Sequence, residues 1–175
     1  MLTDENGNIP EFLFETHRPT EEEVYYYTKY VVISGKMEWE IPLMALIYIE
    51  RFVTWTGILI NHLNWRRIIL ITLIIASKIW DDDSLENIHF PKVMHDITLK
   101  EVNQLEKIFL ELTSFDLHIR GSEYAKYYFI LKTLAYEDAE VYGVLQMEPI
   151  PVDKMSMLQK NTIKAESILK EIHHK

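Results

Sequence analysis

The stretch NWRRIILITLIIASKIW, residues 64–80, decides the fold of this chain. Asn64 is a suitable N-cap, because an asparagine side chain can accept a hydrogen bond from the first turn of a helix. The residues that follow are apolar on nearly every side of a helical wheel, and a helix of this kind is buried. We therefore predict a helix from Asn64 to about Trp80 that the other helices surround.

The sequence on the N-terminal side of this stretch predicts two further helices. Thr20 stands three residues before Glu23, which is the capping-box spacing, so we expect a helix to begin there. Gly35 is expected to end it, because glycine is the usual residue after a helix. A second helix starts near Pro42, since proline at the first helical position loses no hydrogen bond, and Gly57 stops it.

A second capping box marks a fifth helix on the C-terminal side. Thr98 caps this helix, Glu101 completes the box, and apolar residues recur at helical spacing up to about Ser114. The other elements expected here are a short helix over 90–94, an extended exit over 115–117, a helix capped by Ser122 that runs to about Ala135, and a last amphipathic helix over 154–172.

The composition supports a single helical domain. Of 175 residues, 48% are hydrophobic, which suits one compact domain, and only 5 glycines and 6 prolines interrupt the helices. We therefore predict an all-α fold, a single five-helix box with a central third helix, flanked by an N-terminal arm and C-terminal helices. The expected divisions are 1–19 for the arm, 20–135 for the box and 136–175 for a C-terminal extension with one helix.

Cysteine content and charge limit the compartment and the partners. The chain has no cysteine, which excludes disulfides and fits an intracellular protein of the cytoplasm, the nucleus or both. A net charge of −9 makes nucleic acid and anionic membrane surfaces poor partners. The first residues lack a signal-peptide pattern, and the apolar run 68–76 is far shorter than the roughly 20 residues that span a bilayer, so no direct membrane insertion is expected.

No sequence motif predicts an enzyme. His89 and His95 do not form a His-Glu-x-x-His pair. The run Asp81-Asp82-Asp83 lacks the glycine and the distal glutamate of a calcium loop, so we expect a solvated turn at a helix end. Neither a glycine-rich phosphate loop nor a nucleophile elbow is present. We expect no catalytic residue, no cofactor and no metal site.

Two charged residues fall on apolar helix faces. At about 100° per residue, Lys78 lies between Ile71 and Ile74, and Glu106 lies on the apolar face of the fifth helix. A lone charge in such a position is costly unless it is paired. One reading is that Lys78 and Glu106 pair with each other or reach the domain surface, and helix geometry alone favours it. The other reading is that they border an exposed apolar patch and bind a partner's backbone.

A basic-aromatic cluster consists of Trp65, Arg66 and Arg67. This cluster can contact phosphate, or a phosphoryl group on a partner. The alternative is that Trp65 packs in the core and the arginines pair with the abundant acidic residues. The negative field of the whole chain favours the second reading.

Several segments together resemble the cyclin box. The order and separation of these segments also match the cyclin pattern, and they are YIERF at 48–52, ASK at 76–78, LEK at 105–107, LEL at 110–112 and FDL at 115–117. The similarity is closer to the cyclin Y group, which is related to the Pho80-like cyclins. The segments that carry this closer similarity are NWRRI at 64–68, ASKIWDD at 76–82, DIT at 96–98 and YAKYYF at 124–129.

The resemblance implies a regulatory subunit that binds and activates a cyclin-dependent protein kinase, with a partner of the PCTAIRE or PFTAIRE type. In that family, the lysine and glutamate that match Lys78 and Glu106 contact the kinase near its mobile regulatory helix. The alternative is a kinase-independent helical scaffold or adaptor with a cyclin fold, and a phosphorylation-dependent adaptor is a further partner left open. The kinase-binding residues we predict are Lys78, Glu106, Trp80, Asp81, Asp82, Val102 and Phe109.

This sequence departs from many cyclins in two ways. The Met-Arg-Ala-Ile-Leu motif that docks substrates on the first helix is absent from residues 20–24, which puts that docking site in doubt. The arginine that pairs with the second-helix acid is absent as well. Glu50 therefore needs another partner, and Lys29 and an intrahelical neighbour are both open.

Overall fold

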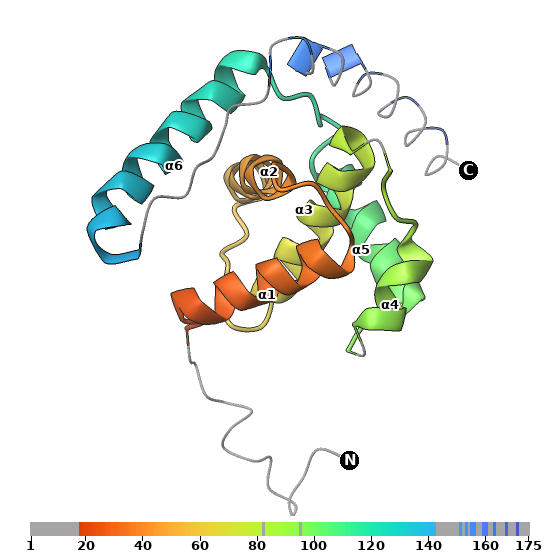
Figure 1. The fold of residues 1–175 in the computed structure, drawn as a ribbon. Coiled ribbons are helices and arrows are strands. Elements are labelled where there is room, and N and C mark those ends of the chain that lie inside the picture. The colour runs from red at the N-terminus through yellow and green to blue at the C-terminus, as the bar shows by residue number, and fades with distance from the viewer. Residues whose placement is uncertain are drawn as a thin grey trace, which may run out of the picture.

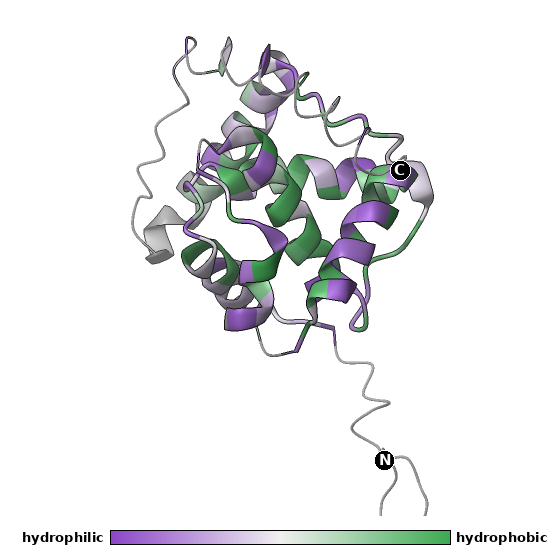
Figure 2. Cartoon of the chain, turned by 90° about the vertical axis from the view of Figure 1, so that its right-hand side faces the viewer, coloured by the Kyte–Doolittle hydropathy of each residue, from purple (hydrophilic) through white to green (hydrophobic). Residues whose placement is uncertain are grey.

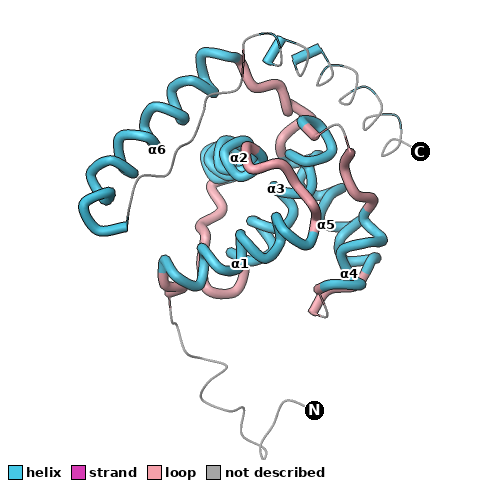
Figure 3. Tube along the Cα trace, viewed as in Figure 1, coloured by secondary structure: helices cyan, strands magenta, loops and turns pink. Residues whose placement is uncertain are grey.

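A computed structural model describes residues 18–142 apart from Asp82 and His95, together with scattered positions from Pro151 to Glu171. Side chains are described for these residues except Val93 and 136–142. The elements are all helical in the described part of the chain, as Figures 1 and 3 show. They are α1 (Glu21–Ser34), α2 (Ile41–Thr56), α3 (Trp65–Trp80), the 3₁₀ turn η2 (Asn87–His89), α4 (Phe90–Val93), α5 (Leu99–Leu112) and α6 (Gly121–Tyr142).

Helix α3 lies at the centre of the domain, which confirms the prediction. Twelve of its sixteen residues are buried, and it packs against α1, α2 and α5. Figure 2 shows hydrophobic residues gathered on the inner helices and hydrophilic residues on the outer turns. The one polar side chain in the middle of α3, Thr72, donates its hydroxyl to the Ile68 carbonyl at 2.8 Å, so its burial leaves no unpaired donor.

Both predicted capping boxes are present. The Thr20 hydroxyl accepts from the Glu23 N–H at 3.1 Å, and the Thr20 N–H donates to the Glu23 carboxylate at 2.7 Å. Thr98 and Glu101 repeat the arrangement at the start of α5. There the hydroxyl and N–H of Thr98 donate to the Glu101 carboxylate and hold the pKa of that carboxyl below its usual value.

Asn64 marks the start of α3 at the predicted position, but by another mechanism. Its side chain makes no capping hydrogen bond to α3. The Asn64 Oδ1 instead accepts from the Asn61 N–H at 2.8 Å, and the Asn64 amide donates to the Leu59 carbonyl at 2.9 Å. The Asn64 side chain therefore stabilises the turn over 59–64 that precedes α3.

Helix α1 ends at Gly35 as predicted, but Gly35 does not supply the left-handed conformation that glycine often takes at a helix end. Gly35 has a right-handed φ of −80°, and the left-handed residue is Lys36, with φ of 51°. The Met37 N–H donates to the Val32 carbonyl at 3.0 Å, which completes a Schellman-type end. A Cβ at position 35 would lie 2.8 Å from the Met37 Cε, the mobile end of that side chain, and 3.1 Å from the Val31 carbonyl oxygen, so the space beside Gly35 is tight.

The exit from α5 is not extended as predicted. Ser114 and Phe115 both have left-handed φ values, of 50° and 56°. The Phe115 N–H turns back to the Leu110 carbonyl at 2.9 Å, so α5 also has a Schellman-type end. This turn buries the Phe115 ring in the core, and that contact offsets the cost of the backbone conformation.

Helix α6 is longer than the sequence suggested. It begins at Gly121, so Ser122 lies inside its first turn, and it runs to Tyr142, which is seven residues beyond the predicted end at Ala135. No glycine or proline follows Ala135 before Gly143, and this lack of a breaker explains the extension. Most of the predicted last helix, 154–172, lies outside the described residues, but its Met155 packs into the core.

None of the described helices combines the length and the apolar character that crossing a membrane requires.

We predict that Lys36→Gly stabilises the domain. Glycine takes a left-handed φ without steric cost, so the free energy of unfolding in urea should rise by about 0.5–1 kcal/mol. Gly35→Ala is the matched control at a right-handed position, where no left-handed strain is relieved, so its effect should stay within about 1 kcal/mol. A loss of stability in Lys36→Gly would show that the left-handed residue is not strained.

Candidate functional site

Lys78 and Glu106 pair with each other across two helices. Lys78 lies in the last turn of α3 and Glu106 in the middle of α5, and the Lys78 Nζ donates to the Glu106 Oε1. The structure therefore shows the pairing that helix geometry favoured. This pair joins the end of the central helix to α5.

The Glu106 carboxylate is satisfied inside the domain. Its second oxygen accepts from the Asn87 side-chain amide at 2.8 Å, and the same amide donates to the Asn103 Oδ1 at 2.8 Å. The Glu106 side chain is only 6% exposed, whereas the Lys78 side chain is 22% exposed. Glu106 thus holds Lys78 in place from beneath, and the ammonium is the part of the pair that solvent reaches.

The held ammonium can bind further acceptors. A lysine ammonium carries three donors, and Glu106 takes one of them. Among the described residues no other acceptor for Lys78 is found. A partner's backbone carbonyl is a suitable acceptor, because it brings no charge that would compete with Glu106.

Two exposed apolar residues are neighbours in sequence of residues that contact this end of α3 or the Lys78–Glu106 pair. Ile88 follows Asn87 in η2 and is exposed. Asp81 follows α3, and its carboxylate accepts from the Glu38 N–H at 3.4 Å, which ties the α1–α2 turn to this end of α3. Trp39 follows Glu38 and is 69% exposed. We call Trp39, Lys78, Asp81 and Ile88 the α3-end surface.

Three of the predicted kinase-binding residues lie in the core. Trp80, Val102 and Phe109 are each 3% exposed or less, so their side chains do not face a partner in this structure. The Trp80 Nε1–H donates to the Tyr48 hydroxyl at 2.9 Å, and the Phe109 ring stacks on Phe52. Trp80 and Phe109 thus join α3 and α5 to α2. Asp82 lies outside the described residues.

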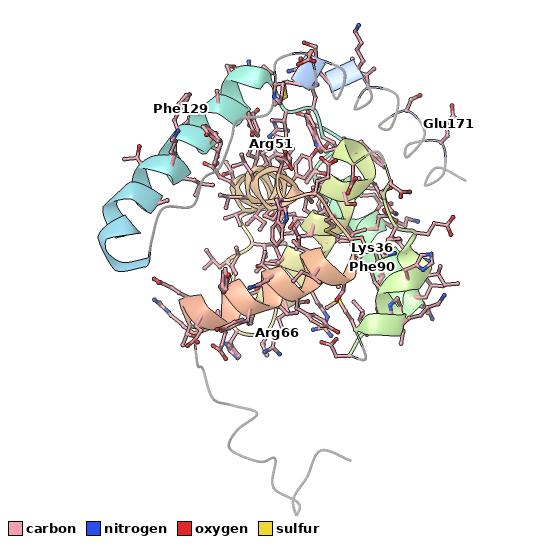
Figure 4. The ribbon with its side chains drawn as sticks, viewed as in Figure 1. Lys36, Arg51, Arg66, Phe90, Phe129 and Glu171 are labelled. Carbon is pink, nitrogen blue, oxygen red and sulfur yellow. The ribbon has the colours of Figure 1, made fainter. Side chains whose placement is uncertain are left out.

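Arg51 holds together three segments, and the sequence reasoning did not find this role. Its guanidinium forms a two-point contact with the Glu123 carboxylate of α6, at 2.6 and 3.2 Å, and donates to the His118 carbonyl at 2.8 Å. Figure 4 shows Arg51 between α2 and the start of α6. The available signal was an arginine that follows a long apolar run in the helix over 41–56.

Glu50 has neither of the partners left open by the sequence. Its side chain is exposed, and no hydrogen bond or ion pair to it is found within the described residues. Lys29 instead donates to the Tyr25 hydroxyl at 3.5 Å. Glu50 lines an open cavity of about 440 Å³ between α2 and α6, which Trp55 and Lys126 also line.

The aromatic residues near the arginines and on α6 divide into core and surface. Trp65 is buried, as the favoured reading predicts. The pairing of Arg66 and Arg67 with acids was wrong, because both are exposed and no carboxylate in the described part of the chain lies within ion-pair distance. On α6, Tyr124 and Tyr128 are core residues, whereas Phe129 is exposed.

Comparison with known families agrees with this architecture. The fold and the site define a class of helical domain. Its central helix is buried, and the end of that helix carries a lysine that an ion pair holds in place. The chain matches the family model described as Cyclin over residues 3–117, more than half of its length, and it belongs to the cyclin family. Cyclins are regulatory proteins and not catalysts, and they generally bind cyclin-dependent kinases. No solved structure matches the chain.

We predict that Arg51→Lys destabilises the domain. Lysine cannot make the two-point contact with Glu123 and the hydrogen bond to the His118 carbonyl together, so the free energy of unfolding should fall by about 1–3 kcal/mol. Arg120→Lys is the matched control, because Arg120 is exposed, and its effect should stay within about 0.5 kcal/mol. Equal stability of the two variants would remove the proposed role of Arg51.

Proposed function

We propose that this cyclin binds and activates a cyclin-dependent kinase of the PCTAIRE or PFTAIRE type, as a member of the cyclin Y-like group. The observation that supports this most directly is the Lys78 ammonium, fixed at the end of α3 by a nearly buried carboxylate. A helix end or loop of a kinase exposes backbone carbonyls that such a cation can satisfy.

The fixed position of Lys78 favours tight binding. A free lysine side chain loses rotamer freedom when it binds, at a cost of roughly 0.5–1.5 kcal/mol. Glu106 already holds Lys78, so part of that cost is met within the folded cyclin. Lys78 is thus the proposed contact, and Glu106 and Asn87 are positioning residues.

Apolar residues of the α3-end surface can supply the remaining binding energy. Trp39 and Ile88 are exposed, and tryptophan is among the residues that most often dominate an interface. Aromatic side chains are enriched at the centres of interfaces and lysine is depleted there, so Trp39 would supply apolar burial and Lys78 a directed hydrogen bond. Asp81 is partly exposed and is a proposed contact for a kinase N–H group, as is its neighbour Asp82.

Activation would follow from a shift between kinase conformations. A kinase is active when a catalytic Lys–Glu pair and the bound magnesium are in place. A partner that binds this arrangement better than the inactive one raises its population. The cyclin would supply binding energy and no catalytic group, and its site of action would be the cytoplasm, the nucleus or both.

The division of the chain follows from the same proposal. The box over 20–135 would carry kinase binding, and the arm over 1–19 and the extension over 136–175 would add contacts or recruit an adaptor. Helix α6 crosses the second boundary, since it continues to Tyr142.

We predict that Lys78→Met together with Glu106→Gln abolishes measurable kinase binding without unfolding the domain. Methionine keeps the apolar stem of lysine, and glutamine still accepts from Asn87, so helical content and melting temperature should change little. Loss of this central contact should weaken binding by about 2–4 kcal/mol, measured by calorimetry.

The exposed pair Lys107 and Glu111 on the same helix provides the matched control, with 3.8 Å between Nζ and Oε1. Lys107→Met with Glu111→Gln removes the same two charges and should leave kinase affinity unchanged. Undiminished binding of the Lys78 and Glu106 variant would remove both residues from the interface.

Kinase activity separates the activator from the scaffold. Purified PCTAIRE- or PFTAIRE-type kinase should phosphorylate a peptide substrate at least tenfold faster when the cyclin is added. The Lys78 and Glu106 variant should give no stimulation at the same concentration. Binding by calorimetry without any gain in phosphorylation would favour the kinase-independent scaffold.

A further inference from the structure

A second charged surface lies at the other end of α3, where α1 and the turn before α3 meet it. A cavity of about 190 Å³ is lined there by Tyr27, His62, Leu63, Arg66, Arg67 and Asp96, among others. Figure 4 places Arg66 beside α1, on the opposite side of the domain from α6. This surface has no part in the proposed kinase contact.

Two guanidinium groups give this cavity its charge. The Arg66 guanidinium lies 5.0 Å from the Trp65 ring and 6.0 Å from the Tyr27 ring, so aromatic faces hold it without neutralising it. Arg67 is exposed beside it. No carboxylate of the described residues forms an ion pair with either arginine, although the chain carries 27 acidic residues. Two exposed arginines that pair with no described carboxylate, in a chain of net charge −9, can offer their charge to a ligand.

The aromatic wall of the cavity is rigid and uncharged. The Tyr27 hydroxyl donates to the Arg66 carbonyl at 3.1 Å, and its ring meets the Trp65 ring edge-on at 5.3 Å. Burial, and then the charge of Asp96, raise the pKa of the Tyr27 phenol well above its usual value, against the effect of the arginines. Tyr27 therefore stays protonated and adds no negative charge.

The acidic groups near the cavity do not cancel this charge. Asp96 is the carboxylate that lines the cavity, and it is exposed. Hydrogen bonds from Thr98 in the capping box lower the pKa of the Glu101 carboxyl, and the charge of Arg67 contributes to this shift. The Glu101 carboxylate forms no ion pair with Arg67. Among the described residues that line the cavity, two permanently charged guanidinium groups thus face one carboxylate.

We propose that this cavity binds a phosphorylated serine or threonine side chain of a partner protein. A phosphoryl group carries nearly two negative charges and three acceptor oxygens, and arginine forks bind it by paired hydrogen bonds. A volume of about 190 Å³ accommodates one phosphoryl group with a few waters.

A phosphopeptide fits this surface better than a nucleic acid or a membrane. A long polyanion would meet the repulsion of a chain with net charge −9, whereas one phosphoryl group samples only the local positive charge. The turn before α3 exposes Leu59 and Leu63, at 77% and 69%. These leucines can cover an apolar side chain next to the phosphorylated residue.

The two sites can be occupied at the same time. Twelve residues separate Arg66 from Lys78, so their Cα positions lie about 18 Å apart along the axis of α3. A phosphoprotein could therefore be held at one end of the central helix while a kinase is held at the other. Binding at Arg66 and Arg67 does not depend on the kinase.

The test uses the full chain and a peptide library with a fixed central phosphoserine or phosphothreonine and random flanking residues. The immobilised protein should retain phosphorylated peptides and should not retain the same library without phosphate. The best retained peptide is then titrated by fluorescence anisotropy at 150 mM salt. It should bind at least tenfold more tightly than its unphosphorylated copy, and millimolar inorganic phosphate should compete.

Charge variants of the cavity locate the binding. Arg66→Gln with Arg67→Gln should weaken binding at least tenfold, and Asp96→Asn should strengthen it a few-fold, because it removes a repelling charge. Arg120→Gln is the matched control at a distant exposed arginine and should have no effect. Circular dichroism should show the same helical content in all variants.

Several results would overturn the proposal. These are equal retention of the two libraries, unchanged affinity in the double arginine variant, or weaker binding in Asp96→Asn. Single-stranded DNA or anionic vesicles that bind as tightly as the phosphopeptide, and through the same arginines, would show a general anion surface instead.

Discussion

Helix α3 has no polar face to leave in water, and this constraint organises the rest of the domain. A helix that is apolar all round is stable only when other helices cover it, so α1, α2 and α5 pack on its sides. Its ends are then the parts of α3 that can reach the surface. The two candidate sites, at Lys78 and at Arg66, both lie at these ends, where charged side chains can emerge from a buried helix.

The two ends of α3 treat charge in opposite ways. At Lys78, a carboxylate from α5 pairs with the cation, and an amide from η2 holds that carboxylate, so the charge is positioned but largely neutralised within the domain. At Arg66, aromatic rings hold the guanidinium and no described carboxylate pairs with it. The first arrangement suits hydrogen bonds to neutral backbone groups, and the second suits an anion.

Local rules predicted most of the fold, because the signals were local. The capping boxes at Thr20 and Thr98 need only four residues each. The burial of α3 follows from the apolar composition of the helix itself. The features that sequence reasoning missed come from side-chain packing, in one case within a tight turn and in two cases between distant segments. Lys36 is left-handed because Met37 folds back over Gly35, and no sequence rule marks a lysine for that conformation. The burial of Trp80 depends on Tyr48, 32 residues away. The role of Arg51 depends on residues that lie between 65 and 72 positions further along the chain.

That long separation has a consequence during protein synthesis. Helix α2 leaves the ribosome well before Asp116, His118 and Glu123, so Arg51 stays hydrated and unbound while the first three helices are being made. The contact closes a loop of 72 residues, and closure of so long a loop is entropically costly unless the intervening helices have already assembled. The Arg51 guanidinium can therefore bind its acceptors only after the nascent chain has been extended into α6.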